Sequence, residues 1–392
     1  MSEEPELVPL ARPVIGEAEE QAVLEVLRSG HLSLGPRLPA FEEAFAARVG
    51  ARHASAVSSG TAGLHLALRA VGVEASPADA GTGPGPEVVT SPFSFIASSN
   101  AGLFERAVPV FVDVDPVTLN VPSAAVAAAV TDRTAALLPV HIFGIPAPTP
   151  QLEGLGVPIV EDACEALGAV HPDGVPVGGR GHPAVFAFYA NKQMTTGEGG
   201  IVTVGDRATK DRLDSERNQG RAPGMAWLDH DRLGFNYRLS DLQCALGLAQ
   251  LGRLDELLGG RERVAAAYAE RLADLAERTG LALPATDADL AATEVAGARR
   301  SWFVYVVRLP RDLDRNATIT ELGRRGIQTR DYLPAIHLFS FYRERFGFRE
   351  GQFPVAEDAA RRGLALPLFP TMTEAQVDRV VAELTDVLTA RR

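Results

Sequence analysis

The sequence predicts an α/β fold, with a large domain built on a mostly parallel seven-stranded sheet between helices and a smaller C-terminal α+β domain. Short apolar runs alternate with stretches whose apolar residues recur at helical spacing. The apolar runs are hydrophobic at successive positions, as in parallel strands that are buried on both faces. The chain has 392 residues, which is long enough for two domains.

Two helical patterns open the chain. Residues 16–28 carry apolar positions at helical spacing before Ser29-Gly30, and Pro39–Val49 ends at Gly50. Seven apolar runs are then candidate strands: Ala54–Val57, Glu87–Thr90, Val108–Val114, Ala135–His141, Val157–Val160, Ala184–Tyr189 and Ile201–Val204. Helical patterns lie between them at Ala62–Ala70 and Ala124–Val130, and the breaker-rich stretch Ala75–Pro86 is expected to be a surface loop.

A long helical region, Ser240–Arg278, follows the last of these strands. Ser240 and Gln243 fit a capping box at its start, and we expect an interruption near Gly259-Gly260. The smaller domain is then predicted from three elements: a strand at Trp302–Leu309, a helix at Ile319–Arg325 and a terminal helix at Thr371–Leu388 opened by a capping box from Thr371 to Glu374. We place the boundary within Leu251–Arg263 and assign residues 1–255 to the large domain and 256–392 to the small one.

Composition excludes several classes of function. A net charge of -12 argues against nucleic acid and against an anionic membrane surface as partners. The eight histidines and two cysteines show no metal-ligand spacing, so no metal site is predicted. No apolar run approaches the roughly 18 residues of a membrane span. Two cysteines cannot form a disulfide framework, and the acidic start lacks the regions of a signal peptide, so we expect a cytoplasmic location.

The most informative residue is Lys192. It follows the apolar run Ala184–Tyr189 and opens a glycine-dense turn that leads into Ile201–Val204. Glycines let backbone approach a ligand closely, and lysine forms Schiff bases with carbonyl compounds, among which pyridoxal phosphate is the commonest cofactor. The alternative is an ordinary solvated surface lysine.

Three further segments each follow a candidate strand. Ser58–Gly63 opens a helix and could bind a phosphate through backbone N–H groups, or could simply cap that helix. Asp162 ends an apolar strand, where a carboxylate could pair with a protonated pyridine nitrogen or cap the next helix. Phe95 could stack on a planar ring or belong to the core. Together with Lys192 they make up the parts of a pyridoxal phosphate site.

In these segments the chain resembles the DegT/DnrJ/StrS aminotransferases, which are sugar aminotransferases of the aspartate aminotransferase (fold type I) superfamily. The resemblance runs from about Ser29 to the end of the chain. The matching segments are Ser29–Pro36, Ser59–Leu68, Leu138–Gly144, Asn191–Lys192 with Thr195–Gly200, Phe235–Gln243, Tyr332–His337 and Leu364–Phe369.

The resemblance implies roles around the cofactor, pyridoxal 5′-phosphate. Lys192 forms the internal aldimine and moves protons, with pyridoxamine phosphate as the intermediate form of the cofactor. Asp162 holds the pyridine nitrogen, Phe95 stacks on the ring, and Glu165 lies near the phenolic oxygen. The residues that bind the phosphate are Gly60, Thr61 and Ala62.

It also implies a homodimer with shared active sites, in which Asn236 reaches the cofactor phosphate of the neighbouring subunit. The residues in segments on the substrate side are Ser33, Gly35, Arg238, Tyr332 and His337.

The chain departs from the family pattern at two positions. Many members have a serine that contacts the phosphate where this chain has Ala187. One hydrogen bond to an anion, worth roughly 1.5–3 kcal/mol, is absent there or supplied by Asn191 or a water. Glu165 replaces the more common glutamine or histidine and suggests amination at C4 of a 4-keto-6-deoxy sugar. Lys192 argues against the dehydratase branch, which has histidine at that position.

These observations predict a ping-pong aminotransferase that moves an amino group from glutamate to a keto group of a nucleotide-linked 4-keto-6-deoxy or 3-keto sugar. A keto-cyclitol of the kind found in aminoglycoside pathways is the alternative substrate. A regulatory protein that holds the cofactor without turnover and a scaffold protein without cofactor are alternatives of another class. Intact Lys192 and Asp162 and the acidic charge count against the regulator.

Overall fold

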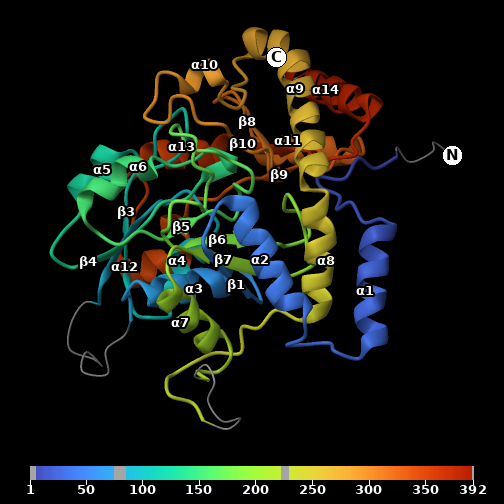
Figure 1. The fold of residues 1–392 in the computed structure, drawn as a ribbon. Helices are drawn as coiled ribbons and strands as arrows, with labels where there is room; N and C mark the ends of the chain where they lie inside the picture. Colours follow the sequence, from blue (N-terminus) through green and yellow to red (C-terminus); the bar gives the residue numbers. More distant parts are fainter. Residues whose placement is uncertain (1–5, 75–84, 222–228, 391–392) are drawn as a thin grey trace.

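The structure is a computed structural model that describes residues 6–74, 85–221 and 229–390. Most of the loop predicted at Ala75–Pro86 lies outside the described residues. A central sheet is covered by helices on both faces, and a smaller sheet with its own helices follows toward the C-terminus (Figure 1).

Within the described residues, seven strands form the central sheet, which is the number predicted, although one of them lies after the predicted segment. Two hydrogen-bonded sets have the orders β1-β7-β6-β5 and β3-β2-β4. Parallel bridges from Leu137 to Ile159 and from Val140 to Asp162 join β4 to the β5 region, so that the sets continue one another. Only β7 runs antiparallel to its neighbours. The strands are β1 (His53–Val57), β2 (Glu87–Thr90), β3 (Val108–Phe111), β4 (Thr134–Leu138), β5 (Glu161–Asp162), β6 (Ala184–Ala187) and β7 (Gly200–Val204).

Helices cover this sheet because alternate strand residues face opposite sides. On one side Val185 and Val202 belong to a cluster with α3, and on the other Phe186 and Ile201 pack with Phe45 of α2. The helix α8 contacts both α1 and α2 (Figure 1). The helices of this part are α1 (Glu17–Ser29), α2 (Arg37–Val49), α3 (Gly60–Ala70), α4 (Ala97–Leu103), α5 (Ser123–Ala129), α6 (Thr149–Leu152), α7 (Arg207–Arg217) and α8 (Asp241–Gly252), with short 3₁₀ turns η2 (Ile142–Gly144) and η3 (Glu153–Leu155).

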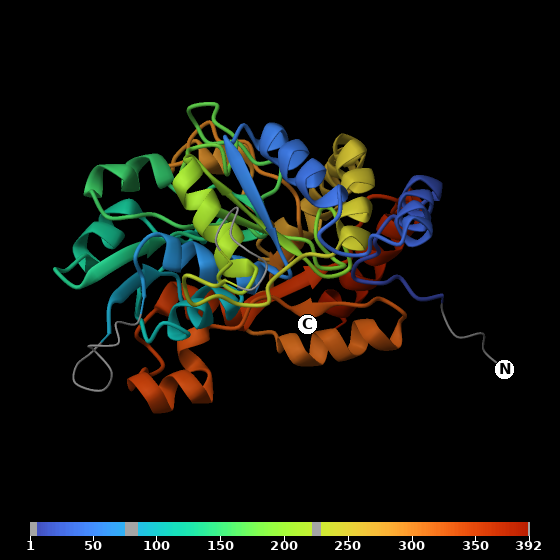
Figure 2. The ribbon, with the colours of Figure 1, turned by 60° about the horizontal axis from the view of Figure 1, so that its bottom comes forward.

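The C-terminal part is built on an antiparallel sheet of order β8-β10-β9. Its elements are α9 (Leu254–Thr279), α10 (Asp287–Leu290), β8 (Tyr305–Arg308), α11 (Arg315–Arg324), β9 (Arg330–Asp331), η4 (Ile336–Leu338), α12 (Ser340–Phe346), α13 (Pro354–Arg362), β10 (Gly363–Leu366) and α14 (Glu374–Thr389). One hydrophobic cluster draws its buried members from residues 264–388, with Val8 added from the N-terminal segment. Most helices after residue 310 lie along one side of the molecule (Figure 2). The division at residues 255 and 256 stays a prediction.

Several predicted elements differ from the structure in their bounds, among them the helix predicted at Ile319–Arg325, which is α11 (Arg315–Arg324), and three more differences have a clear cause. The helical region breaks at Arg253, and α9 runs through Gly259 and Gly260 without interruption. Residues 157–160 form no ladder of their own, because Pro158 lacks an N–H and pairing there is limited to a bridge at Ile159. The terminal helix begins at Glu374, three residues later than predicted, and its capping box of Thr373 and Gln376 lies two residues after the predicted one.

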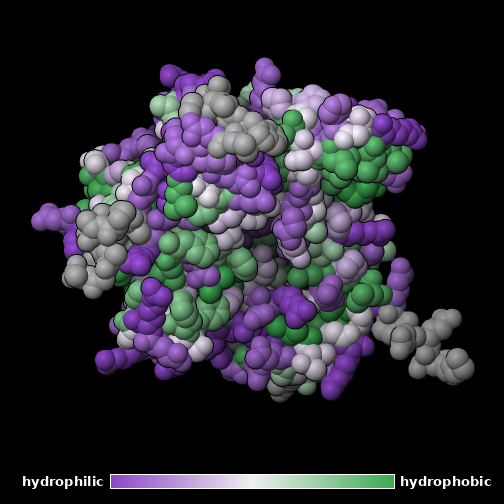
Figure 3. Space-filling model, turned by 90° about the horizontal axis from the view of Figure 1, so that it is seen from below, coloured by the Kyte–Doolittle hydropathy of each residue, from purple (hydrophilic) through white to green (hydrophobic). Residues whose placement is uncertain are grey.

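Among the described residues, no helix is both long and apolar enough to cross a membrane. Seen from below the view of Figure 1, the surface is hollowed near its centre, and apolar residues lie among the polar ones around the hollow (Figure 3).

Candidate active site

A cavity of about 570 Å³ opens where several strands of the central sheet end. The strands β2, β5 and β6 point the same way, so the segments that follow Thr90, Asp162 and Ala187 meet at one edge of the sheet. The start of α3 and the segment after β9 complete the walls. The predicted site residues that line this cavity are Gly60, Thr61, Phe95, Asp162, Glu165, Lys192 and Tyr332.

Lys192 extends into this cavity from the turn after β6. Its N–H donates to the carbonyl of Tyr189 at 3.0 Å, which closes the turn. Its Nζ lies 4.0 Å from the centre of the Phe303 ring and 3.9 Å from Oε1 of Glu165. The next side chain, Gln193, donates to the carbonyl of Glu165 at 2.6 Å. The amine is therefore held between an aromatic face and a carboxyl group.

The chain contains only two lysines, Lys192 and Lys210. The amine of Lys210 donates to Glu42 at 2.9 Å and to Asp214 at 2.8 Å, which commits it to an ion-pair cluster. Lys192 is thus the one lysine side chain that reaches the cavity. This count was available in the sequence and strengthens the choice of Lys192.

Asp162 is the last residue of β5 and is almost fully buried. Its Oδ2 accepts the hydroxyl of Ser98 at 2.7 Å, and its Oδ1 accepts the N–H of Cys164 at 3.2 Å. The carboxylate is therefore fixed in orientation at the cavity wall by two donors.

Glu165 and Tyr332 share another wall. Burial raises the pKa of Glu165, and the nearby Lys192 amine partly opposes this effect. Oε2 of Glu165 accepts the N–H of Phe143 at 2.9 Å. Burial also raises the pKa of the Tyr332 phenol. This wall therefore places a carboxyl group and a phenol, each able to hold a proton, in the cavity that contains the lysine amine.

The segment predicted to bind phosphate starts α3. Gly60 and Thr61 line the cavity, and the first N–H groups of a helix have no partner within it. A side chain at Gly60 would lie 2.8 Å from Cβ of Ala187, so glycine is required there. Ala62 differs from the prediction, because its N–H donates to the N-cap Ser59 at 3.1 Å and it does not line the cavity.

Two more residues shape this end of the cavity. Oδ1 of Asn191 is buried without a hydrogen-bond partner among the described residues, and Asn191 lines the cavity beside Ala187. Oδ1 can only accept a hydrogen bond, so only the NH2 group of Asn191 could take the place of the missing serine hydroxyl. Phe95 also lines the cavity and is 62% exposed, unlike the buried core residue Phe93. Its ring is available to a planar ligand.

The structure does not bring the remaining predicted substrate residues to the cavity of this chain. Ser33 and Asn236 are exposed. Gly35 donates its N–H to Asp241, whose carboxylate would clash with any side chain at this position. Arg238 donates to Oδ1 of Asn218 at 3.1 Å, beside the end of β1.

His337 is a correction. It is fully buried, and its Nε2 lies 3.0 Å from Oε1 of Glu357. Tyr332, Leu333 and Pro334 of the same segment line the cavity, but the turn η4 carries His337 into the protein interior. At this turn, a residue that is close in sequence to cavity residues does not itself reach the cavity.

Comparisons with known proteins decide the family. The model of the DegT/DnrJ/EryC1/StrS aminotransferase family matches residues 13–385. The chain belongs to this family. It is accordingly a pyridoxal phosphate-dependent aminotransferase of fold type I.

Relatives of this aminotransferase cover almost its whole length. It is 37% identical to the GDP-perosamine synthase of Caulobacter vibrioides, with 97% of this chain and 98% of the relative covered. It is 35% identical to the spore coat polysaccharide biosynthesis protein SpsC of Bacillus subtilis, with 97% of each chain covered. Among solved structures, DesV of S. venezuelae in complex with a ketimine intermediate is similar, with a TM-score of 0.83, 35% identity and 94% of each chain covered.

The donor set fits the cofactor that the family uses. Free N–H groups at the start of a helix suit a phosphate, an oriented carboxylate suits a protonated ring nitrogen, and a lysine amine suits an aldehyde. In the aminotransferase these groups are Gly60 and Thr61, Asp162 and Lys192, and all line one cavity.

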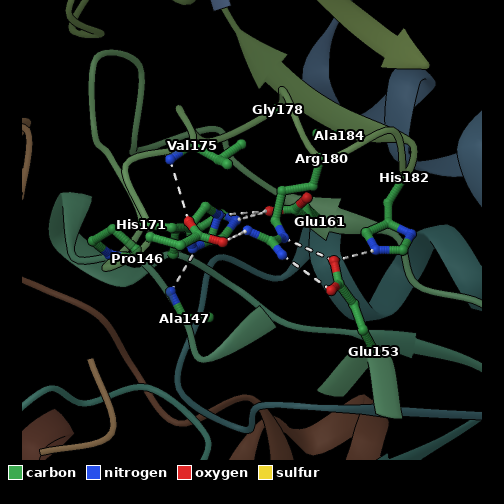
Figure 4. A network of polar contacts seen from close by, with 12 residues as sticks. Pro146, Ala147, Glu153, Glu161, His171, Val175, Gly178, Arg180, His182 and Ala184 are labelled. Atoms are coloured by element: carbon green, nitrogen blue, oxygen red, sulfur yellow. Dashed lines mark hydrogen bonds and ion pairs between the residues drawn. The ribbon is translucent and has the colours of Figure 1, made fainter. Parts of the chain in front are cut away.

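Behind the cavity, the neighbour of Asp162 anchors a buried polar network (Figure 4). Oε2 of Glu161 lies 2.8 Å from Nε2 of His141 and 3.5 Å from Nε2 of His171. Nδ1 of His141 accepts the N–H of Ala147, so the neutral ring carries its proton on Nε2, facing Glu161. These three side chains are close enough together to hold a metal ion, but Nε2 of His141, the atom that faces Glu161, carries the proton of the neutral ring and cannot bind a metal in that state.

Three residues near Lys192 escaped the sequence analysis of the aminotransferase. Ser98 orients Asp162, Phe303 lies under the lysine amine, and Arg261 donates to the Lys192 carbonyl. Each comes from a different element, far along the chain. A buried arginine in an otherwise apolar helix face was the one usable signal, at Arg261.

Proposed function

We propose that this aminotransferase moves an amino group from glutamate to a keto group of a nucleotide-linked sugar. The observation that carries the proposal is the meeting of Lys192, Asp162 and the start of α3 around one cavity. The sugar class is supported by a relative named for GDP-perosamine and by another named for polysaccharide biosynthesis. The amino donor is inferred from the resemblance to the family.

When bound, pyridoxal phosphate supplies an aldehyde for a Schiff base and a ring that withdraws electrons. The chain supplies the rest. Asp162, oriented by Ser98, would keep the ring nitrogen protonated, and Phe95 would offer its ring for stacking. The free amine of Lys192 takes a proton from one carbon atom and returns it to another, which requires the amine to be neutral at that moment.

Two groups next to Lys192 support this proton transfer. Glu165 has a raised pKa, so it can carry a proton close to the lysine. The Phe303 ring lies 4.0 Å from Nζ and limits the directions in which the amine can move.

We also propose a homodimer, in which Asn236 completes the phosphate site of the neighbouring subunit. The exposure of Asn236 in a single chain supports this arrangement. The division into a large domain, 1–255, and a small domain, 256–392, is supported by the separate hydrophobic cluster of the C-terminal part, whose buried members, apart from Val8, come from residues 264–388. A cytoplasmic location is supported by the two unpaired thiols, Cys164 and Cys244.

A substrate panel tests the function. Purified protein with pyridoxal phosphate is first incubated with glutamate, then separately with keto-sugar nucleotides and keto-cyclitols, and products are identified by mass. We expect 2-oxoglutarate in the first step and an aminated nucleotide sugar in the second, with Lys192→Ala inactive and Lys210→Arg active. Amination of the cyclitols alone would contradict the proposed substrate class, and no oxoglutarate would contradict the donor.

A further inference from the structure

Arg261 is a charged side chain that α9 directs into the protein interior. It is 2% exposed. Its Nη2 donates to the carbonyls of Asn191 at 3.2 Å and Lys192 at 3.0 Å. Its Nη1 donates to the carbonyls of Phe303 at 2.8 Å and Leu368 at 3.3 Å. One guanidinium therefore joins α9 to three separate segments of the chain.

This arginine has no counterion among the described residues. Burial lowers the pKa of Arg261 to about 10, and the only charge interaction that opposes this effect comes from the Tyr332 phenol. The guanidinium still carries its charge at neutral pH. Burying this charge costs hydration free energy that a hydrocarbon side chain at the same place would not lose. What arginine offers here is a rigid fork with several donors at fixed angles.

Arg261 binds the backbone of both Lys192 and Phe303, whose side chains contact each other. The carbonyl of Lys192 and the carbonyl of Phe303 are bound to the same guanidinium, and the Lys192 amine lies 4.0 Å from the Phe303 ring. The Phe303 ring in turn lies 6.1 Å from the ring of Tyr332 in the cavity wall. Movement of the guanidinium would thus shift the amine relative to the ring beneath it.

The glycine before Arg261 allows this arrangement. A side chain at Gly260 would lie 2.6 Å from the carbonyl oxygen of Pro370, so only glycine lets α9 approach this segment. The same close approach places the guanidinium within reach of Leu368. The Gly259-Gly260 pair, expected from the sequence to interrupt a helix, contributes close packing instead.

We propose that Arg261 is a positioning residue that fixes the Lys192 turn against Phe303, so that the amine keeps the place required for proton transfer. The proposal rests on the proposed role of Lys192. It assigns to Arg261 no contact with the cofactor or the substrate.

The test compares Arg261→Lys with Arg263→Lys. Arg263 lies on the same helix and donates to the carbonyl of Pro370 at 2.9 Å, without reaching the Lys192 turn. In protein without added cofactor, we expect faster amide exchange across residues 188–200 in Arg261→Lys only. With pyridoxal phosphate, we expect the pH midpoint of the Schiff-base absorbance to shift, and the single-turnover rate with glutamate to fall on the order of ten- to a hundredfold.

The proposal would be overturned if Arg261→Lys had the same amide exchange, Schiff-base pH midpoint and single-turnover rate as the wild type. It would also be overturned if the variant lost thermal stability while the midpoint and the rate stayed unchanged. If Arg261→Lys does not fold, the pH midpoint of the Schiff-base absorbance is measured in Phe303→Leu instead. That variant keeps the Phe303 carbonyl but removes the ring under the amine, so a shifted midpoint is expected and an unchanged one overturns the proposal. A wild type without any Schiff-base band would contradict the proposed function, whereas the exchange measurement still reports whether Arg261 anchors the turn.

Discussion

Glu161 is a buried carboxylate that stabilises the strand on which Asp162 lies. Burial acts to raise the pKa of Glu161, but the hydrogen bond from His141 and the nearby His171 ring outweigh it and hold the pKa well below the ordinary value of 4.5. The stabilisation is therefore fully present above pH 4.5 and is lost as the pH falls toward the lower pKa of the folded state. Because Glu161 precedes Asp162 in β5, this network also fixes the strand that presents Asp162.

Glu161→Gln is expected to lower the free energy of unfolding by about 2 kcal/mol at neutral pH, because a neutral oxygen replaces the charged acceptor of the His141 N–H. The difference from wild type should shrink as the pH falls below 4.5. Urea unfolding across this pH range checks it. Glu153→Gln is the control, since this carboxylate pairs with Arg180 near the surface and should contribute about 1 kcal/mol or less. A difference that is constant or grows toward acid pH would contradict the account of Glu161.

At the scale of residues, the cavity residues that could be predicted from the sequence are those at or after the ends of strands. Lys192, Asp162 and Phe95 each follow an apolar run, and parallel strands end at one edge of a sheet. The contacts of Arg261 and Phe303 with the Lys192 turn could not be predicted, because they join segments about 70 and more residues apart along the chain. His337 was misplaced because a short 3₁₀ turn reverses the direction of its segment.

At the scale of elements, strands and helices were predicted where local pattern and tertiary packing agree. The predicted limits of Glu87–Thr90 match β2, since the strand is buried throughout. The start of the terminal helix was ambiguous, because both Thr371–Glu374 and Thr373–Gln376 fit a capping box. Burial of Met372 against Tyr268 settles the choice, and that contact is invisible in the local sequence.

The two glycines of α9 give a matched pair of expected effects. A Cβ at Gly259 meets nothing within 4 Å, so Gly259→Ala should stabilise the protein by about 0.5–1 kcal/mol through helix propensity. A Cβ at Gly260 would collide with the backbone of Pro370, so Gly260→Ala should destabilise it by about 1–3 kcal/mol. Thermal unfolding of both variants measures this. Equal effects of the two substitutions would show that α9 does not pack on Pro370 as described.

At the scale of the whole molecule, the proposed homodimer predicts complementation between inactive variants. Lys192→Ala and Asn236→Ala each damage both sites of their own dimer. A mixed dimer has one intact site, made of Lys192 from one subunit and Asn236 from the other. Refolding an equal mixture should therefore restore about a quarter of the wild-type activity. A mixture no more active than the separate variants would show that Asn236 serves its own subunit or none.

The central claim is that Lys192 holds pyridoxal phosphate, and the composition of the chain makes it unusually easy to test. Only Lys192 and Lys210 offer a side-chain amine. The purified protein is incubated with pyridoxal phosphate, reduced with borohydride and digested, and the peptides are weighed. We predict the reduced adduct on the peptide of Lys192 in the wild type and in Lys210→Arg, and its loss in Lys192→Ala. An adduct on Lys210 alone, or none in the wild type, would contradict the account.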